Sequence, residues 1–124
     1  MRLYLMIALA GSVGAMARFW MINAVHTWFS RDFPYGTFAV NVLGSALMGF
    51  LGVWLTLKLQ WAPEYRVAVL TGFLGAFTTM STFSIDSLNL IERNEWVLAG
   101  LYIVGTVVLC LVAARGGMLL AERI

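Results

Sequence analysis

The stretch TGFLGAFTTMSTFS, residues 71–84, contains five hydroxyl side chains within its last seven positions, inside an otherwise apolar segment. Gly72 and Gly75 precede this hydroxyl cluster. Glycine permits unusual backbone conformations, and hydroxyl groups can satisfy the backbone groups that an interrupted membrane helix releases. We therefore expect a helix that breaks within residues 75–80.

The composition around this stretch is that of an integral membrane protein. Of the 124 residues, 61% are hydrophobic and only 11% are charged, and the mean hydropathy is +0.87. An apolar helix needs about 20 residues to cross a bilayer. The neutral runs predict an all-α protein with four transmembrane helices in a single domain, residues 1–124. The approximate spans are 3–25, 37–59, 66–91 and 96–117, with Gly116 and Gly117 marking the end of the fourth.

The N-terminal segment MRLYLMIALAGSVGA also has the outline of a secretory signal peptide. Apolar sequence continues beyond Ala15, however, which favours a membrane span. Cys110 is the only cysteine and His26 the only histidine. The chain therefore has no intrachain disulfide, no Cys/His metal cluster and no nucleophilic triad.

The charges are few and scattered. The formal net charge is +2, and no basic patch suggests a nucleic-acid partner. Four basic residues fall on the N-terminal side of the predicted membrane and two on the other: Arg2, Lys58, Arg66 and Arg123 against Arg31 and Arg93. This weak bias favours a cytoplasmic N-terminus, but it is small enough to permit insertion in both orientations.

Polar residues also occur inside the other spans. Asn41 lies in the second span, where an amide either bonds to another helix or lines a polar path. Tyr102, Thr106 and Cys110 are four residues apart in the fourth span and so share one helix face. That face is consistent with packing or with a polar track. Arg18 lies within the first span, where it either reaches the membrane surface or has a functional role.

The hydroxyl cluster is better suited to binding ions than to catalysis. Backbone carbonyls at a helix break can coordinate a cation, while hydroxyls and the amides that begin the next helix can face an anion. No base within the cluster could activate a serine. We therefore expect a protein that is not an enzyme.

Three segments carry a family resemblance: GSVGAMAR (11–18), YGTFAVNVLGSALMGF (35–50) and TGFLGAFTTMSTFS (71–84). Together they resemble the CrcB, or Fluc, family of fluoride channels over essentially the whole chain. The resemblance implies a dual-topology, antiparallel homodimer in the lipid bilayer of a bacterial inner membrane. It further implies two pores for passive fluoride exit and a structural sodium ion between the subunits. The carbonyls of Gly75 and Thr78 would bind that sodium ion.

The resemblance also implies a set of pore residues. Arg18 would draw anions toward the pore, and Asn41, Ser81, Thr82, Phe83, Tyr102 and Thr106 would line it. The family pattern reads TTFSTFS, whereas this chain has Met80 at the position of the first phenylalanine. A thioether packs flexibly but lacks the positive edge of an aromatic ring. We expect a retained fold with altered fluoride throughput.

Two other functions remain as alternatives. A small four-span drug/proton antiporter would need a membrane carboxylate, and the first acidic residue of the spans is Asp86, near the far end of the third. A non-transporting assembly subunit would explain the small-residue helix faces but would give the hydroxyl cluster no role. Passive fluoride release without a proton gradient distinguishes the channel from both.

Overall fold

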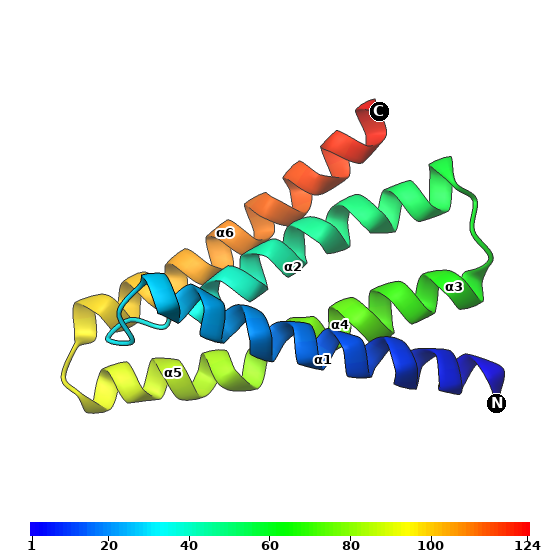
Figure 1. Ribbon diagram of the computed structural model, residues 1–124. Coiled ribbons are helices and arrows are strands. Elements are labelled where there is room, and N and C mark those ends of the chain that lie inside the picture. Colours follow the sequence, from blue (N-terminus) through cyan, green and yellow to red (C-terminus); the bar gives the residue numbers. More distant parts are fainter.

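The computed structural model describes residues 1–124 and contains only helices and their connections (Figure 1). Four helical stretches are long and apolar enough to cross a membrane. The expectation of an all-helical membrane protein with four spans is therefore confirmed. The elements are α1 (Arg2–Trp28), α2 (Tyr35–Val53), η1 (Trp54–Lys58), α3 (Pro63–Val67), η2 (Ala68–Leu74), α4 (Gly75–Phe77), α5 (Met80–Glu92) and α6 (Trp96–Arg123).

Spans that follow each other in the chain run in opposite directions. In Figure 1 both termini lie at the same end, and α2 runs beside α6 while α1 lies against the segment that contains η2 and α4. The elements η1 and η2 are π-helical, with wider turns than an α-helix. Hydropathy does not distinguish such turns from α-helix, so these two segments were not expected.

Glycines permit the closest helix contacts. A Cβ on Gly14 of α1 would overlap the carbonyl of Phe73, and one on Gly49 of α2 would overlap the carbonyl of Ala114. Helix α6 continues through Gly116 and Gly117 to Arg123 rather than ending at these glycines. A Cβ on Gly117 would overlap the backbone of α2, so this glycine serves helix packing.

Little of the apolar side-chain surface is buried within one chain. Leu90, Ala99 and Tyr102 form a small core between α5 and α6, whereas Leu111 of α6 is 68% exposed. Helices that face lipid need no apolar cover from protein, because lipid tails are as apolar as the side chains. Packing is instead concentrated where the helices cross.

The third span changes direction between α4 and α5. Helix α4 ends at Phe77, and Thr78 (φ −83°, ψ 157°) and Thr79 (φ −151°, ψ 115°) have extended backbone angles. Helix α5 then begins at Met80. These two extended residues separate the span into two helical halves and place several backbone groups away from their usual helical partners.

Candidate ion site at the interrupted third span

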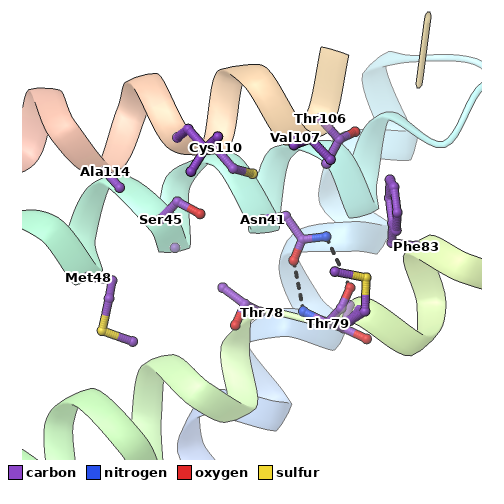
Figure 2. Close-up of a pocket in the computed structure, with 13 residues that line it drawn as sticks. Asn41, Ser45, Met48, Thr78, Thr79, Phe83, Thr106, Val107, Cys110 and Ala114 are labelled. Atoms are coloured by element: carbon purple, nitrogen blue, oxygen red, sulfur yellow. Dashed lines mark hydrogen bonds between the residues drawn. The ribbon is translucent and has the colours of Figure 1, made fainter. Parts of the chain in front are cut away.

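A cavity of about 430 Å³ lies beside the two extended residues. Figure 2 shows that it is bordered by α2, α5 and α6 and by the connection between α4 and α5. None of its lining residues carries a formal charge. They are Asn41, Gly44, Ser45, Met48, Thr78, Thr79, Met80, Phe83, Thr106, Val107, Cys110, Leu111 and Ala114.

Asn41 holds the interruption in place from α2. Its Oδ1 accepts a hydrogen bond of 2.8 Å from the Thr79 amide, and its Nδ2 donates to the Thr79 carbonyl over 3.1 Å (Figure 2). Both residues are buried. One side-chain amide thereby satisfies both backbone groups of a residue that has left the helix, which is the condition for burying such a residue in a membrane.

The Thr79 hydroxyl caps α5. It accepts a hydrogen bond of 3.2 Å from the Thr82 amide, donates to Thr82 Oγ1 over 3.0 Å and lies 3.2 Å from Ser81 Oγ. An N-cap hydroxyl compensates amides that have no preceding turn to bond to. Three of the five clustered hydroxyls therefore form one network at the start of α5.

These bonds release two carbonyls of the third span. In an unbroken α-helix, the amide of residue i+4 bonds to the carbonyl of residue i. Gly75 and Thr78 would thus pair with the amides of Thr79 and Thr82. Those amides instead donate to Asn41 Oδ1 and Thr79 Oγ1. The Gly75 and Thr78 carbonyls therefore lose these helical donors.

Five of the predicted site residues line the cavity. Asn41, Thr78 and Phe83 are among them, and so is Met80, which is 70% exposed. Thr106 of α6 is only 5% exposed, and its Oγ1 has no hydrogen-bond partner. An unpartnered buried hydroxyl is uncommon in native proteins.

The other predicted residues lie outside this lining. Tyr102 is fully buried one turn before Thr106; its ring lies 5.2 Å from that of Phe83, and its hydroxyl donates to Asp86 Oδ2 over 3.3 Å. Ser81 and Thr82 belong to the hydroxyl network described above. Gly75 is exposed on α4, and Arg18 is half-buried on α1, away from the cavity.

Two features of the site were not predicted from the sequence. Thr79 was not identified as the cap of α5, although threonine is among the preferred N-cap residues. Ser45 and Met48 were not identified as lining residues, and for Cys110 the sequence left packing and a polar track both open. Their position depends on how α2 and α6 are rotated, which no local pattern reveals.

Comparison with known proteins identifies the family. Residues 5–118 match the family described as CrcB-like protein, Camphor Resistance (CrcB). A relative from Methylococcus capsulatus, named fluoride-specific ion channel FluC, is 52% identical over 118 residues, covering 95% of this chain but 52% of the relative. The chain thus spans about half the length of that relative.

Two further relatives bear the same name and are similar over nearly their whole length. The protein from Magnetococcus marinus is 45% identical, with 96% of its length covered. The protein from Hahella chejuensis is 40% identical, with 93% covered. Each alignment includes 95% of this chain. The resemblance found in the three sequence segments is therefore confirmed, and the chain belongs to the CrcB family.

Proposed function

We propose that this chain is the subunit of a fluoride-specific ion channel that releases fluoride passively from the cytoplasm. The observation that best supports this function is a neutral cavity beside an interrupted span. The relatives of this chain are named fluoride-specific ion channels. A channel lets an ion cross without changing it chemically, so the protein is not an enzyme.

The cavity offers the donors that a fluoride path needs. Fluoride is small and strongly hydrated, and a pore must replace its water with hydrogen-bond donors. Asn41 Nδ2 carries a second N–H beyond the one given to Thr79, and the Thr106 hydroxyl has no partner. The positive ring edge of Phe83 adds a weak anion contact. No Lys or Arg lines the cavity, which favours release of the ion over retention.

The remaining predicted residues extend this path. Ser81 and Thr82 supply hydroxyls at the first turn of α5, and Tyr102 continues the polar face of α6 beyond Thr106. Arg18 of α1 attracts anions toward the entrance. Met80 lines the cavity with a thioether, which binds anions poorly. We therefore propose reduced fluoride throughput compared with a phenylalanine at this position.

The carbonyls of Gly75 and Thr78 fit a structural sodium ion. Gly75 and Thr78 have lost their helical donors to Asn41 and Thr79, and oxygen atoms of uncharged carbonyls suit a hard cation. Gly75 is exposed on its subunit, so a second copy can approach it. Sodium would compensate the carbonyl dipoles of both subunits where the third span is broken, and would thereby link the two chains.

The charge distribution supports an antiparallel homodimer. The end that holds both termini is basic, with Arg2, Lys58, Arg66, Arg115 and Arg123 against Glu64 and Glu122. The opposite end is acidic, with Arg31 and Arg93 against Asp32, Asp86, Glu92 and Glu95, and it stays acidic when Arg18 of α1 is counted with it. Antiparallel pairing brings opposite charges to each membrane surface, whereas parallel pairing stacks like charges. The single four-span domain would insert both ways in a bacterial inner membrane.

Fluoride efflux tests the proposed function. The purified chain is reconstituted into liposomes loaded with potassium fluoride, valinomycin balances the charge, and a fluoride electrode records release without a proton gradient. We expect rapid release, and much slower release of chloride. Protein-free liposomes provide the control. Release only under a proton gradient would indicate the antiporter, and no release under either condition would indicate an assembly subunit.

A further inference from the structure

The connection between α1 and α2 lies beside the turn between α5 and α6, at the end of the molecule opposite the termini (Figure 1). In that turn, Nη2 of Arg93 donates a hydrogen bond of 2.8 Å to the carbonyl of Asp32, 61 positions away in the chain. The same nitrogen lies 3.3 Å from Glu95 Oε2. The bond from Arg93 therefore ties the connection between the first two spans to the turn between the last two.

The residue that follows Asp32 packs on the buried tyrosine of α6. The ring of Phe33 meets the ring of Tyr102 edge to face, with centroids 5.5 Å apart and planes at 85°. Tyr102 is fully buried, and its ring also lies 5.2 Å from that of Phe83. Phe83 lines the cavity beside the interrupted span. Three aromatic rings thus form a continuous row from the α1–α2 connection to that cavity.

A second pocket opens at this end of the molecule. Its volume is about 540 Å³, and most of its lining residues are polar or charged: Arg31, Pro34, Asp86, Asn89, Leu90, Glu92 and Arg93. The Tyr102 hydroxyl bonds to Asp86, which lines this outer pocket, and the Tyr102 ring contacts Phe83, which lines the inner cavity. Tyr102 therefore forms part of the boundary between the outer pocket and the cavity.

We propose that Phe33, held by the bond between Arg93 and Asp32, fixes the Tyr102 ring and thereby excludes chloride from the passage between the outer pocket and the cavity. This selectivity rests on the proposed function, whereas the bond from Arg93 does not. Phe33 acts through Tyr102, so it is a positioning residue.

The reason is the size of the two anions. Fluoride and chloride carry the same charge, but chloride is larger, so a boundary of packed rings separates them only while the rings cannot move apart. Close packing resists such movement, because every ring is held by its neighbours. Loss of the Phe33 ring leaves space beside Tyr102, and surrounding groups relax into such a space. The Tyr102 ring would then yield to the larger ion.

The tie between the two connections is measured first, by amide hydrogen exchange of residues 30–38 with mass spectrometry. We expect exchange at least fivefold faster in Arg93→Gln, because the shorter side chain loses the bond to the Asp32 carbonyl. Glu95→Gln is the matched control, since it removes the ion pair of Arg93 and leaves that bond in place. Equal exchange in the wild type and Arg93→Gln overturns the tie. This readout needs no transport, so it stands even if the protein releases no fluoride and the proposed function fails.

Selectivity is measured second, as separate effluxes of fluoride and chloride from liposomes. We expect Phe33→Leu to raise chloride efflux at least tenfold relative to fluoride efflux, and Arg93→Gln to change this ratio in the same direction. Phe33→Tyr keeps the ring and should keep the wild-type ratio. The matched control is Phe29→Leu. Phe29 lies at the start of the same connection, is 55% exposed and packs its ring on Tyr35, outside the core around Tyr102.

The ratio of the two effluxes separates a selective boundary from a general loss of structure. A variant that only unfolds loses both effluxes together, without a gain in chloride. An unchanged ratio in Phe33→Leu overturns the role of Phe33, as does an equal change in Phe29→Leu or Phe33→Tyr. A wild-type ratio in Arg93→Gln overturns the part assigned to the bond with Asp32.

Discussion

Asn41 and Thr79 form a reciprocal pair of hydrogen bonds, 2.8 Å from the Thr79 amide to Oδ1 and 3.1 Å from Nδ2 to the Thr79 carbonyl. The two residues are 38 positions apart in the chain. This pair anchors the interruption of the third span to α2. It also takes the Thr79 amide away from the Gly75 carbonyl. Asn41 of the proposed fluoride path therefore helps to form the proposed sodium site.

Replacing Asn41 by alanine should destabilise the protein and abolish fluoride efflux. The substitution leaves the buried amide and carbonyl of Thr79 without partners, at a cost of about 1–3 kcal/mol for each group. Thermal unfolding in detergent and liposome efflux measure the two effects. Asn23→Ala is the control, because Asn23 is exposed and its loss should change neither measurement. Equal unfolding temperatures for the two variants would contradict the anchoring role.

Replacing Thr79 by valine should weaken the start of α5. Valine keeps the shape of threonine but cannot accept the bond from the Thr82 amide, and loss of an N-cap costs about 0.5–2 kcal/mol. Thr79→Ser retains a hydroxyl and should stay near wild-type stability. Thermal unfolding compares the two variants. A serine variant as unstable as the valine variant would mean that the hydroxyl network is not what stabilises α5.

Replacing Gly49 by alanine should separate α2 from α6. Its Cβ would overlap the carbonyl of Ala114, and overpacking of this kind costs about 1–3 kcal/mol. Gly52→Ala is the matched control in the same helix, since a Cβ there meets nothing within 4 Å. Alanine also favours helix over glycine, by roughly 0.5–1 kcal/mol. We expect a lower unfolding temperature for the first variant and an equal or higher one for the second.

Replacing Met80 by phenylalanine should raise fluoride efflux, by about tenfold if one aromatic anion contact contributes roughly 1.4 kcal/mol to the barrier. The reason is the positive ring edge that a thioether lacks. Met16→Phe is the control, because Met16 is 63% exposed on α1, away from the cavity. Equal efflux and equal selectivity over chloride in wild type and Met80→Phe would refute the assigned role of this residue.

Sodium should stabilise the protein if the carbonyls of Gly75 and Thr78 bind it. A ligand that binds only the folded state adds about 2.7 kcal/mol at one hundred times its dissociation constant. Thermal unfolding is followed as sodium chloride replaces potassium chloride at constant ionic strength. We expect the unfolding temperature to rise and then saturate with sodium. Identical curves in both salts would exclude a site selective for sodium.

Some of the site residues could be recognised from the sequence around them, and others could not. Asn41, Met80 and Phe83 stood out as a buried amide and as members of a dense hydroxyl and aromatic motif, and all three line the cavity. Thr79 looked like one hydroxyl among five in the sequence. In the structure its backbone bonds to Asn41 and its hydroxyl caps α5. Cys110 stood out only by its spacing from Thr106, and its place in the lining depends on helix rotation.

The sequence by itself determined that the chain is an all-helical membrane protein with four spans. Long apolar runs suffice for this, because a helix in lipid satisfies its own backbone groups and length alone matches it to the bilayer. Only the tertiary structure decided which groups meet at the interruption. The bonds between Asn41 and Thr79 exist because α2 lies beside the connection from α4 to α5, and that proximity takes the Thr79 amide away from the Gly75 carbonyl.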